Sequence, residues 1–163
     1  MIALYGDPGT GKSAWARAHF GATAYFKDSD DWWCGYDGHQ QVIMDDIDCG
    51  SLPANVLKYL FDRFPLQVEC KCGFHQFNAK TIVVTSNSAR EEWYKWDSLR
   101  DKDLLPGILA RIEYIVKFSR DGIEVVKEPL QKPFASVCPS DCQFCKQYWK
   151  EAGATKVIPP RSK

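Results

Sequence analysis

The sequence predicts an α/β domain in which a central, mainly parallel sheet is flanked by helices. Short apolar runs suited to buried strands alternate with segments whose apolar residues recur at helical spacing. This alternation favours a parallel sheet covered on both faces. The chain has 163 residues and is 45% hydrophobic, which is enough for one domain with its own core.

Each expected element follows from its local composition. The strands are expected at residues 2–5, 23–26, 41–44, 66–69, 81–85 and 112–118, and the helices at 13–20, 52–64, 90–96 and 103–109. The run 81–85, Thr-Ile-Val-Val-Thr, is the most β-prone and should be a central strand. Ser51 is a suitable N-cap for the helix 52–64, and Pro65 should stop it. We place the domain at 1–118 and a loosely structured, proline-punctuated extension at 119–163.

Charge and cysteine content limit the functional classes. The formal net charge is +0, from 21 Lys and Arg against 21 Asp and Glu, so DNA binding would need a local patch or contacts multiplied in an oligomer. No apolar run approaches the roughly 20 residues of a membrane span, so we expect no membrane partner. The 7 cysteines are an odd number, which indicates a reducing, intracellular setting.

A phosphate-binding loop follows the first expected strand and opens the first expected helix. Its pattern is Gly-x-x-x-x-Gly-Lys-Ser, in which glycines let backbone N–H groups surround phosphates. Lys12 is expected to reach the β and γ phosphates of ATP, and the Ser13 hydroxyl to ligate Mg²⁺. The alternative is a Gly/Pro turn that matches by coincidence. The expected nucleotide-binding residues are Gly6, Asp7, Pro8, Gly9, Thr10, Gly11, Lys12 and Ser13.

Two carboxylates end the strand 41–44. Ligands of open parallel sheets bind beyond the carboxyl ends of the strands, so Asp45 and Asp46 are expected beside the phosphate loop. One can hold Mg²⁺ and the other can orient the attacking water, and we favour Asp45 for the metal and Asp46 for the water. A solvated acidic turn is the alternative. Asn87, after the strand 81–85, could sense the γ-phosphate or simply form a turn.

This compact order of motifs resembles superfamily 3 helicases. Within them it looks most like the helicase domain of the replication-initiator (Rep) proteins of circoviruses and related viruses with small circular single-stranded DNA. The match covers roughly residues 2–118, and its carrying stretches are 6–13, 32–36 (Trp-Trp-Cys-Gly-Tyr), 42–46, 61–71 (including Asp-Arg-Phe-Pro) and 81–87. Such Rep proteins begin with a nickase domain, which the printed sequence does not contain, so we expect an excised helicase domain or a chain without that domain.

The resemblance implies an AAA+-like P-loop ATPase that translocates 3′→5′ on single-stranded DNA during rolling-circle replication. It implies a ring, usually a hexamer, in the host nucleus. It also implies that Lys71, His75 and Lys80 contact DNA, that Arg111 is an arginine finger, and that Asn87 is the sensor. The lysines could instead be solvated, and Arg111 could form a structural ion pair.

Other readings stay open. A small-molecule P-loop kinase would need an arginine-bearing lid, and an assembly module would bind ATP without motor activity.

Trp32, Trp33 and Tyr36 are expected to pack rather than to bind ligands. Three tail cysteines have zinc-ligand spacing: Cys138, Cys142 and Cys145. A zinc site would need a fourth ligand from a distant residue, Cys70, Cys72 or His75, so reduced thiols are favoured.

Overall fold

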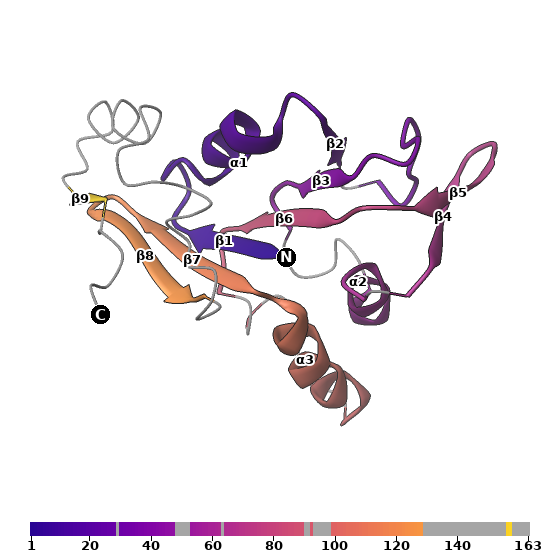
Figure 1. Ribbon diagram of the computed structural model, residues 1–163. Helices are drawn as coiled ribbons and strands as arrows, with labels where there is room; N and C mark the ends of the chain where they lie inside the picture. The colour runs from indigo at the N-terminus through magenta and orange to yellow at the C-terminus, as the bar shows by residue number, and fades with distance from the viewer. Residues whose placement is uncertain are drawn as a thin grey trace.

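In the part of the chain that the structure describes, the fold is a seven-stranded sheet between helices, with a separate two-stranded hairpin (Figure 1). The computed structural model describes residues 1–28, 30–47, 53–62, 64–89, 92, 99–128 and 156–157. The strands are β1 (Ile2–Gly6), β2 (Ala24–Lys27), β3 (Gln41–Met44), β4 (Leu66–Cys70), β5 (Gly73–Phe77), β6 (Thr81–Ser86), β7 (Tyr114–Ser119), β8 (Gly122–Lys127) and β9 (Lys156–Val157). The helices are α1 (Lys12–Phe20), α2 (Ala54–Leu60) and α3 (Leu99–Arg111).

The large sheet has the order β2-β3-β6-β1-β7-β8-β9. Its pairings from β2 to β7 are all parallel, β8 runs antiparallel to β7, and β9 runs parallel to β8. The predicted α/β class with a mainly parallel sheet is confirmed. The expected central position of the strand 81–85 is also confirmed, because β6 lies between β3 and β1.

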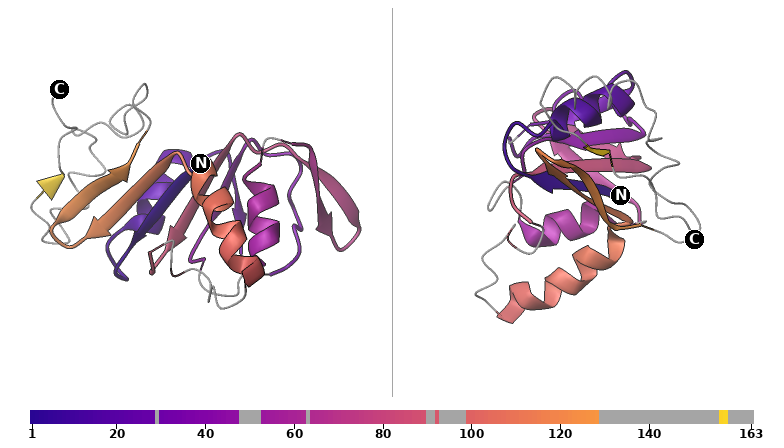
Figure 2. Two further views of the ribbon diagram at one scale, coloured as in Figure 1. Left: turned by 90° about the horizontal axis from the view of Figure 1, so that it is seen from below. Right: turned by 90° about the vertical axis from the view of Figure 1, so that its left-hand side faces the viewer.

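The two faces of the sheet bury two apolar clusters, because side chains alternate along each strand. Val83 of β6 packs in a cluster with Trp15 of α1. Its neighbour Val84 packs in the other cluster, with Leu57 of α2 and Ile108 of α3. Figure 2 shows α1 on one side of the sheet and α2 and α3 on the other. Burying one aliphatic side chain such as Leu57 contributes about 1.5–3 kcal/mol.

Some boundaries differ from the sequence predictions. The helix expected over 52–64 is shorter, because Pro53 is extended (ψ 139°) before α2 and the backbone turns at Phe61 after it. Asp62 N–H already bonds the Tyr59 carbonyl at 3.1 Å, three residues back, which marks the end of the helix. The expected N-cap Ser51 and most of the expected helix 90–96 lie outside the described residues. The sheet also continues past residue 118 through β8.

An aromatic cluster ties the β4–β5 hairpin to the segment 30–40. Trp33 and Tyr36 are 4% and 0% exposed, and their rings both contact Phe77 of β5. Trp33 N–H donates to the Glu69 carbonyl at 2.8 Å, and Asn78 N–H donates to the Tyr36 hydroxyl at 2.8 Å. The expected packing role of Trp33 and Tyr36 is confirmed, and Trp32 is half-buried.

Candidate active site

The phosphate loop lies at the carboxyl edge of the sheet, between the end of β1 and the start of α1. Gly6 has φ 141°, and a Cβ there would stand 1.9 Å from the Phe118 carbonyl oxygen of β7. Only glycine allows this approach of the two strands. Gly9 and Gly11 have φ 76° and 91°, also in the left-handed region. The Thr10 hydroxyl donates to the Asp7 carbonyl at 2.7 Å and closes the loop on itself.

Lys12 folds back into the loop that contains it. Its Nζ donates to the carbonyls of Gly6 at 2.8 Å and Asp7 at 2.9 Å, and to Asn87 Oδ1 at 3.0 Å. The residue is only 6% exposed, and this burial lowers the pKa of Lys12, against the opposing effect of nearby acidic groups, Asp46 first. The ammonium group is therefore held among oxygen acceptors where phosphates are expected.

Asn87 links the lysine to the second acidic residue. Its Nδ2 donates to Asp46 Oδ1 at 2.8 Å while its Oδ1 accepts from Lys12. Asp46 has φ 55°, which is unusual for a residue with a side chain. The structure thus brings together three predicted site residues from three different segments in one hydrogen-bonded path.

Asp45 faces α1 instead. Its Oδ1 accepts from the Thr85 hydroxyl at 2.7 Å, and its Oδ2 lies 3.4 Å from Arg17 Nη2. Burial raises the pKa of Asp45, but a stronger set of hydrogen bonds, the first from Ser13, brings the pKa below its usual range. Asp45 and Ser13 are therefore adjacent, and the carboxylate is kept ionised as a metal ligand must be.

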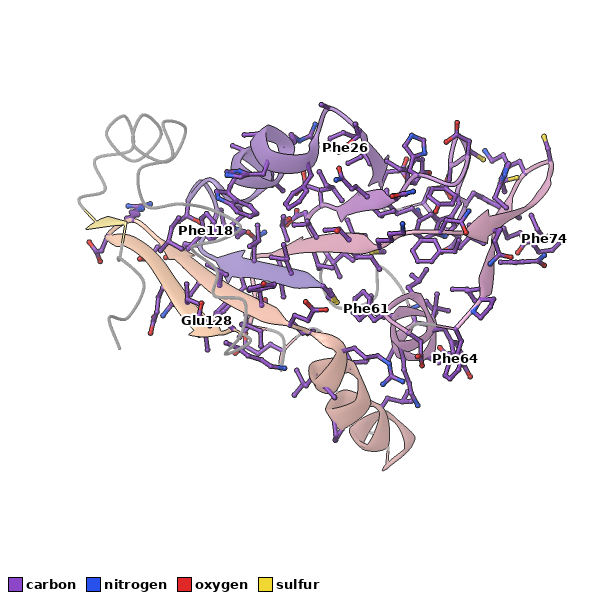
Figure 3. The ribbon with its side chains drawn as sticks, in the orientation of Figure 1. Phe26, Phe61, Phe64, Phe74, Phe118 and Glu128 are labelled. Atoms are coloured by element: carbon purple, nitrogen blue, oxygen red, sulfur yellow. The ribbon has the colours of Figure 1, made fainter. Side chains whose placement is uncertain are left out.

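Two residues at this site were not predicted from the sequence. Arg17 of α1 contacts Asp45 and also stacks over the Phe26 ring, with its guanidinium carbon 4.6 Å from the ring centroid. Figure 3 shows Phe26 beside α1. Thr85 is 1% exposed and bonds the Asp45 carboxylate. The register could have indicated Thr85, because Met44 pairs with Val84, so the next residues of both strands are neighbours.

Comparison with known proteins now decides the family. A family model described as RNA helicase matches residues 2–88, more than half of the chain. The chain belongs to this helicase family. The match confirms the resemblance to superfamily 3 helicases and agrees with the P-loop fold.

Curated relatives of this helicase domain are all viral Replication-associated proteins. The Goose circovirus protein is 45% identical over 95 residues, and the Porcine circovirus 1 protein is 47% identical over 94 residues. These alignments cover 58% and 56% of this chain, and 32% and 30% of the relatives. The Pigeon circovirus protein is 33% identical over 132 residues, which are 81% of this chain and 40% of that protein. This helicase-family chain therefore spans less than half of the length of these relatives.

The three residues expected to contact DNA do not share one place in the helicase domain. Lys71 lies at the turn between β4 and β5, and His75, which is exposed, pairs with Val68 and so lies on the same face of the hairpin as that residue. Lys80 lies at the base, where its N–H donates to the Gln40 carbonyl at 2.8 Å. The outward face has Phe74, 65% exposed, which Figure 3 shows at the protruding end.

Arg111 forms an ion pair within its own chain. Its Nη2 donates to Asp62 Oδ2 at 2.5 Å, and its Nη1 donates to the Gly107 carbonyl at 2.7 Å. The two charged side chains are 28% and 17% exposed. A structural ion pair was the alternative to an arginine finger, and the structure contains this ion pair. To act as a finger, Arg111 would first have to break its contact with Asp62.

The tail cysteines, for which reduced thiols were favoured over zinc ligands, cannot be placed in the structure. Cys138, Cys142 and Cys145 lie outside the described residues. Cys70 and Cys72 have free thiols at the hairpin turn. Across the described ranges, no three or more His, Cys, Asp and Glu side chains gather where they could hold a metal. None of the described helices has both the length and the apolar character needed to cross a bilayer.

Proposed function

We propose that the chain hydrolyses MgATP and uses the reaction to move 3′→5′ along single-stranded DNA in rolling-circle viral replication. The observation that carries this proposal is the hydrogen-bonded path Lys12–Asn87–Asp46 beside the Ser13–Asp45 pair. Membership of the helicase family implies a nucleotide bound together with a metal ion. The viral relatives are named for replication, which supports the DNA substrate.

The side chains divide the chemistry between them. Lys12 would exchange its two carbonyl partners for phosphate oxygens, because charged oxygens are better acceptors for an ammonium group. Mg²⁺ would fit the hard oxygen donors of Ser13 and Asp45, with phosphates and water as the other ligands, and would neutralise charge that develops on the phosphates. Asp46 would orient the attacking water, and Asn87 would lie between that carboxylate and the lysine.

DNA contact and ring assembly are further parts of the proposal. The hairpin projects from the amino-terminal edge of β6, away from the phosphate loop, so DNA and nucleotide would be held at opposite ends of the domain (Figure 1). Lys71 at its turn would contact phosphates, and the exposed Phe74 could stack on a base. Arg111 would reach a neighbouring subunit's nucleotide in a ring, usually of six, after release from Asp62.

The test is ATP hydrolysis with and without single-stranded DNA. Lys12→Ala should abolish hydrolysis in both conditions. Lys71→Ala should remove only the stimulation by DNA, whereas Lys117→Ala, a change to an exposed lysine of β7, should leave the stimulation intact. The protein's size with ATP present should be measured in parallel, to show whether the ring has assembled under the conditions of the assay.

Each outcome favours one function. Hydrolysis stimulated by DNA supports the helicase motor. If an assembled ring hydrolyses ATP at the same rate with and without DNA, the DNA proposal is refuted. Phosphate transfer to a nucleoside monophosphate would identify a kinase. Absence of hydrolysis in every assembly state would leave an ATP-bound assembly module.

A further inference from the structure

Thr85 is a buried polar residue near the carboxyl end of the central strand β6. It follows Val83 and Val84 in β6 and is 1% exposed. A buried hydroxyl without partners costs stability, so its hydrogen bonds explain why this position can be polar. Both hydrogen bonds of the hydroxyl lead to one short segment of the chain.

The segment is the acidic pair and the residue after it. The Thr85 hydroxyl donates to Asp45 Oδ1 at 2.7 Å and accepts from Asp46 N–H at 2.8 Å. The Thr85 carbonyl accepts from Ile47 N–H at 2.8 Å. One residue of β6 therefore holds three consecutive residues at the end of β3, two of them through one oxygen atom.

These bonds give the two carboxylates different directions. Asp45 has one oxygen held by Thr85, and this carboxylate lies on the α1 side with Ser13 and Arg17. The bond to Asp46 N–H accompanies a left-handed backbone at Asp46, whose carboxylate meets Asn87 instead. A flexible acidic turn would let either carboxylate approach the metal.

We propose that Thr85 is a positioning residue that assigns Asp45 to the metal and Asp46 to the attacking water. This inference rests on the proposed ATP hydrolysis and deepens it. Thr85 touches neither ATP nor metal in this assignment, and it acts through the two carboxylates. Partners one step removed from a metal typically change its affinity or the activity by about 10–100-fold when they are lost.

The experiment compares wild type with Thr85→Val, Thr85→Ser and Thr81→Val. Valine keeps the shape but has no hydroxyl, whereas serine keeps the hydroxyl. Thr81→Val makes the same change in the same strand, at the end remote from the acidic pair. The measurements are Mn²⁺ affinity in the presence of ADP by electron paramagnetic resonance, ADP affinity without metal, and kcat and KM for ATP.

Thr85→Val should weaken Mn²⁺ binding and lower kcat, each about 10–100-fold, with metal-free ADP affinity within about twofold of wild type. Thr85→Ser should stay within about threefold of wild type in every measurement, and Thr81→Val should match wild type. Equal Mn²⁺ affinity of Thr85→Val and wild type would overturn the proposal. So would an equal loss in Thr85→Ser, since packing of the methyl group would then explain the effect.

Two further results keep the inference separate from the proposed function. If wild type hydrolyses no ATP but Thr85→Val still binds Mn²⁺ more weakly than wild type, the positioning role stands and the hydrolysis proposal fails. If Thr85→Val does not fold, Thr85→Cys replaces it, because the cysteine side chain is similar in size to that of threonine and its thiol forms only weak hydrogen bonds. Thr85→Cys should bind Mn²⁺ more weakly than wild type, and unchanged Mn²⁺ affinity would overturn the proposal.

Discussion

Replacing Gly6 by alanine should destabilise the fold even without nucleotide. The added Cβ would lie 1.9 Å from the carbonyl oxygen and 2.9 Å from the carbonyl carbon of Phe118. Both atoms belong to the backbone of β7, which pairs with β1 from Ile2 to Gly6, so they cannot move as a side chain could. Strands β1 and β7 would have to separate at the carboxyl edge of the sheet.

The matched control is Gly9→Ala in the same loop. Gly9 has φ 76°, but apart from its own neighbours in the chain no atom of the described residues lies within 4 Å of a Cβ built there. The free energy of unfolding of Gly9→Ala should fall only by the cost of an alanine in the left-handed region, about 1–2 kcal/mol. In Gly6→Ala the steric overlap adds to a similar backbone strain, so the free energy of unfolding should fall by about 4 kcal/mol or more. For a domain of this size these losses correspond to decreases in Tm of about 2–8 °C for Gly9→Ala and about 8–16 °C or more for Gly6→Ala.

The assay is thermal unfolding of the nucleotide-free proteins, followed by far-ultraviolet circular dichroism. Urea denaturation of the same proteins gives the free energy of unfolding. Equal losses in the two variants would show that the close approach of β1 and β7 does not limit stability, and would refute the reasoning.

Three more predictions concern charged and polar contacts. A double-mutant cycle of Asp62→Ala and Arg111→Ala should give a coupling free energy of about 1–2 kcal/mol in urea unfolding, and a value near zero would argue against the ion pair. Asn87→Ala should lower kcat about 10–100-fold with little change in ADP affinity, unlike the control Asn78→Ala; equal kcat values would contradict a role for the amide. The folded pKa of Asp45 lies below its unfolded value of about 4, so its stabilising contribution is present above that pH and is lost as pH falls through the folded pKa. The stability difference between wild type and Asp45→Asn, measured in urea, should therefore shrink between about pH 6 and about pH 3, and a constant difference would count against it.

The sequence was sufficient for the parts of the fold that depend on local pattern. Gly6, Lys12 and Ser13 have a fixed spacing next to an apolar run, which places the loop between a strand and a helix. The acidic pair follows a strand of the same sheet, so its position at the carboxyl edge could be predicted too. The family match confirms the helicase family that these motifs predicted.

The rest depended on contacts between distant segments. Arg111 is separated from Asp62 by 49 residues, so no spacing in the sequence reveals their ion pair. Thr85 is a strand-forming residue in a β-prone run, and its hydroxyl acquires a role only when β3 and β6 pair in register. Lys71 and Lys80 are near in sequence, but the length of β5 separates them.

The central strand β6 gives the two ends of the domain a fixed spacing. It begins at Thr81, just beyond the hairpin base, and ends at Ser86, just before Asn87. Its six residues span about 20 Å of extended chain, and hydrogen bonds to β3 and β1 on either side prevent it from stretching or sliding alone. Adding or deleting one residue would also turn the hydroxyl of Thr85 to the opposite face of the sheet. Natural or engineered variation in length should therefore be tolerated in the hairpin turn and hardly at all in this strand.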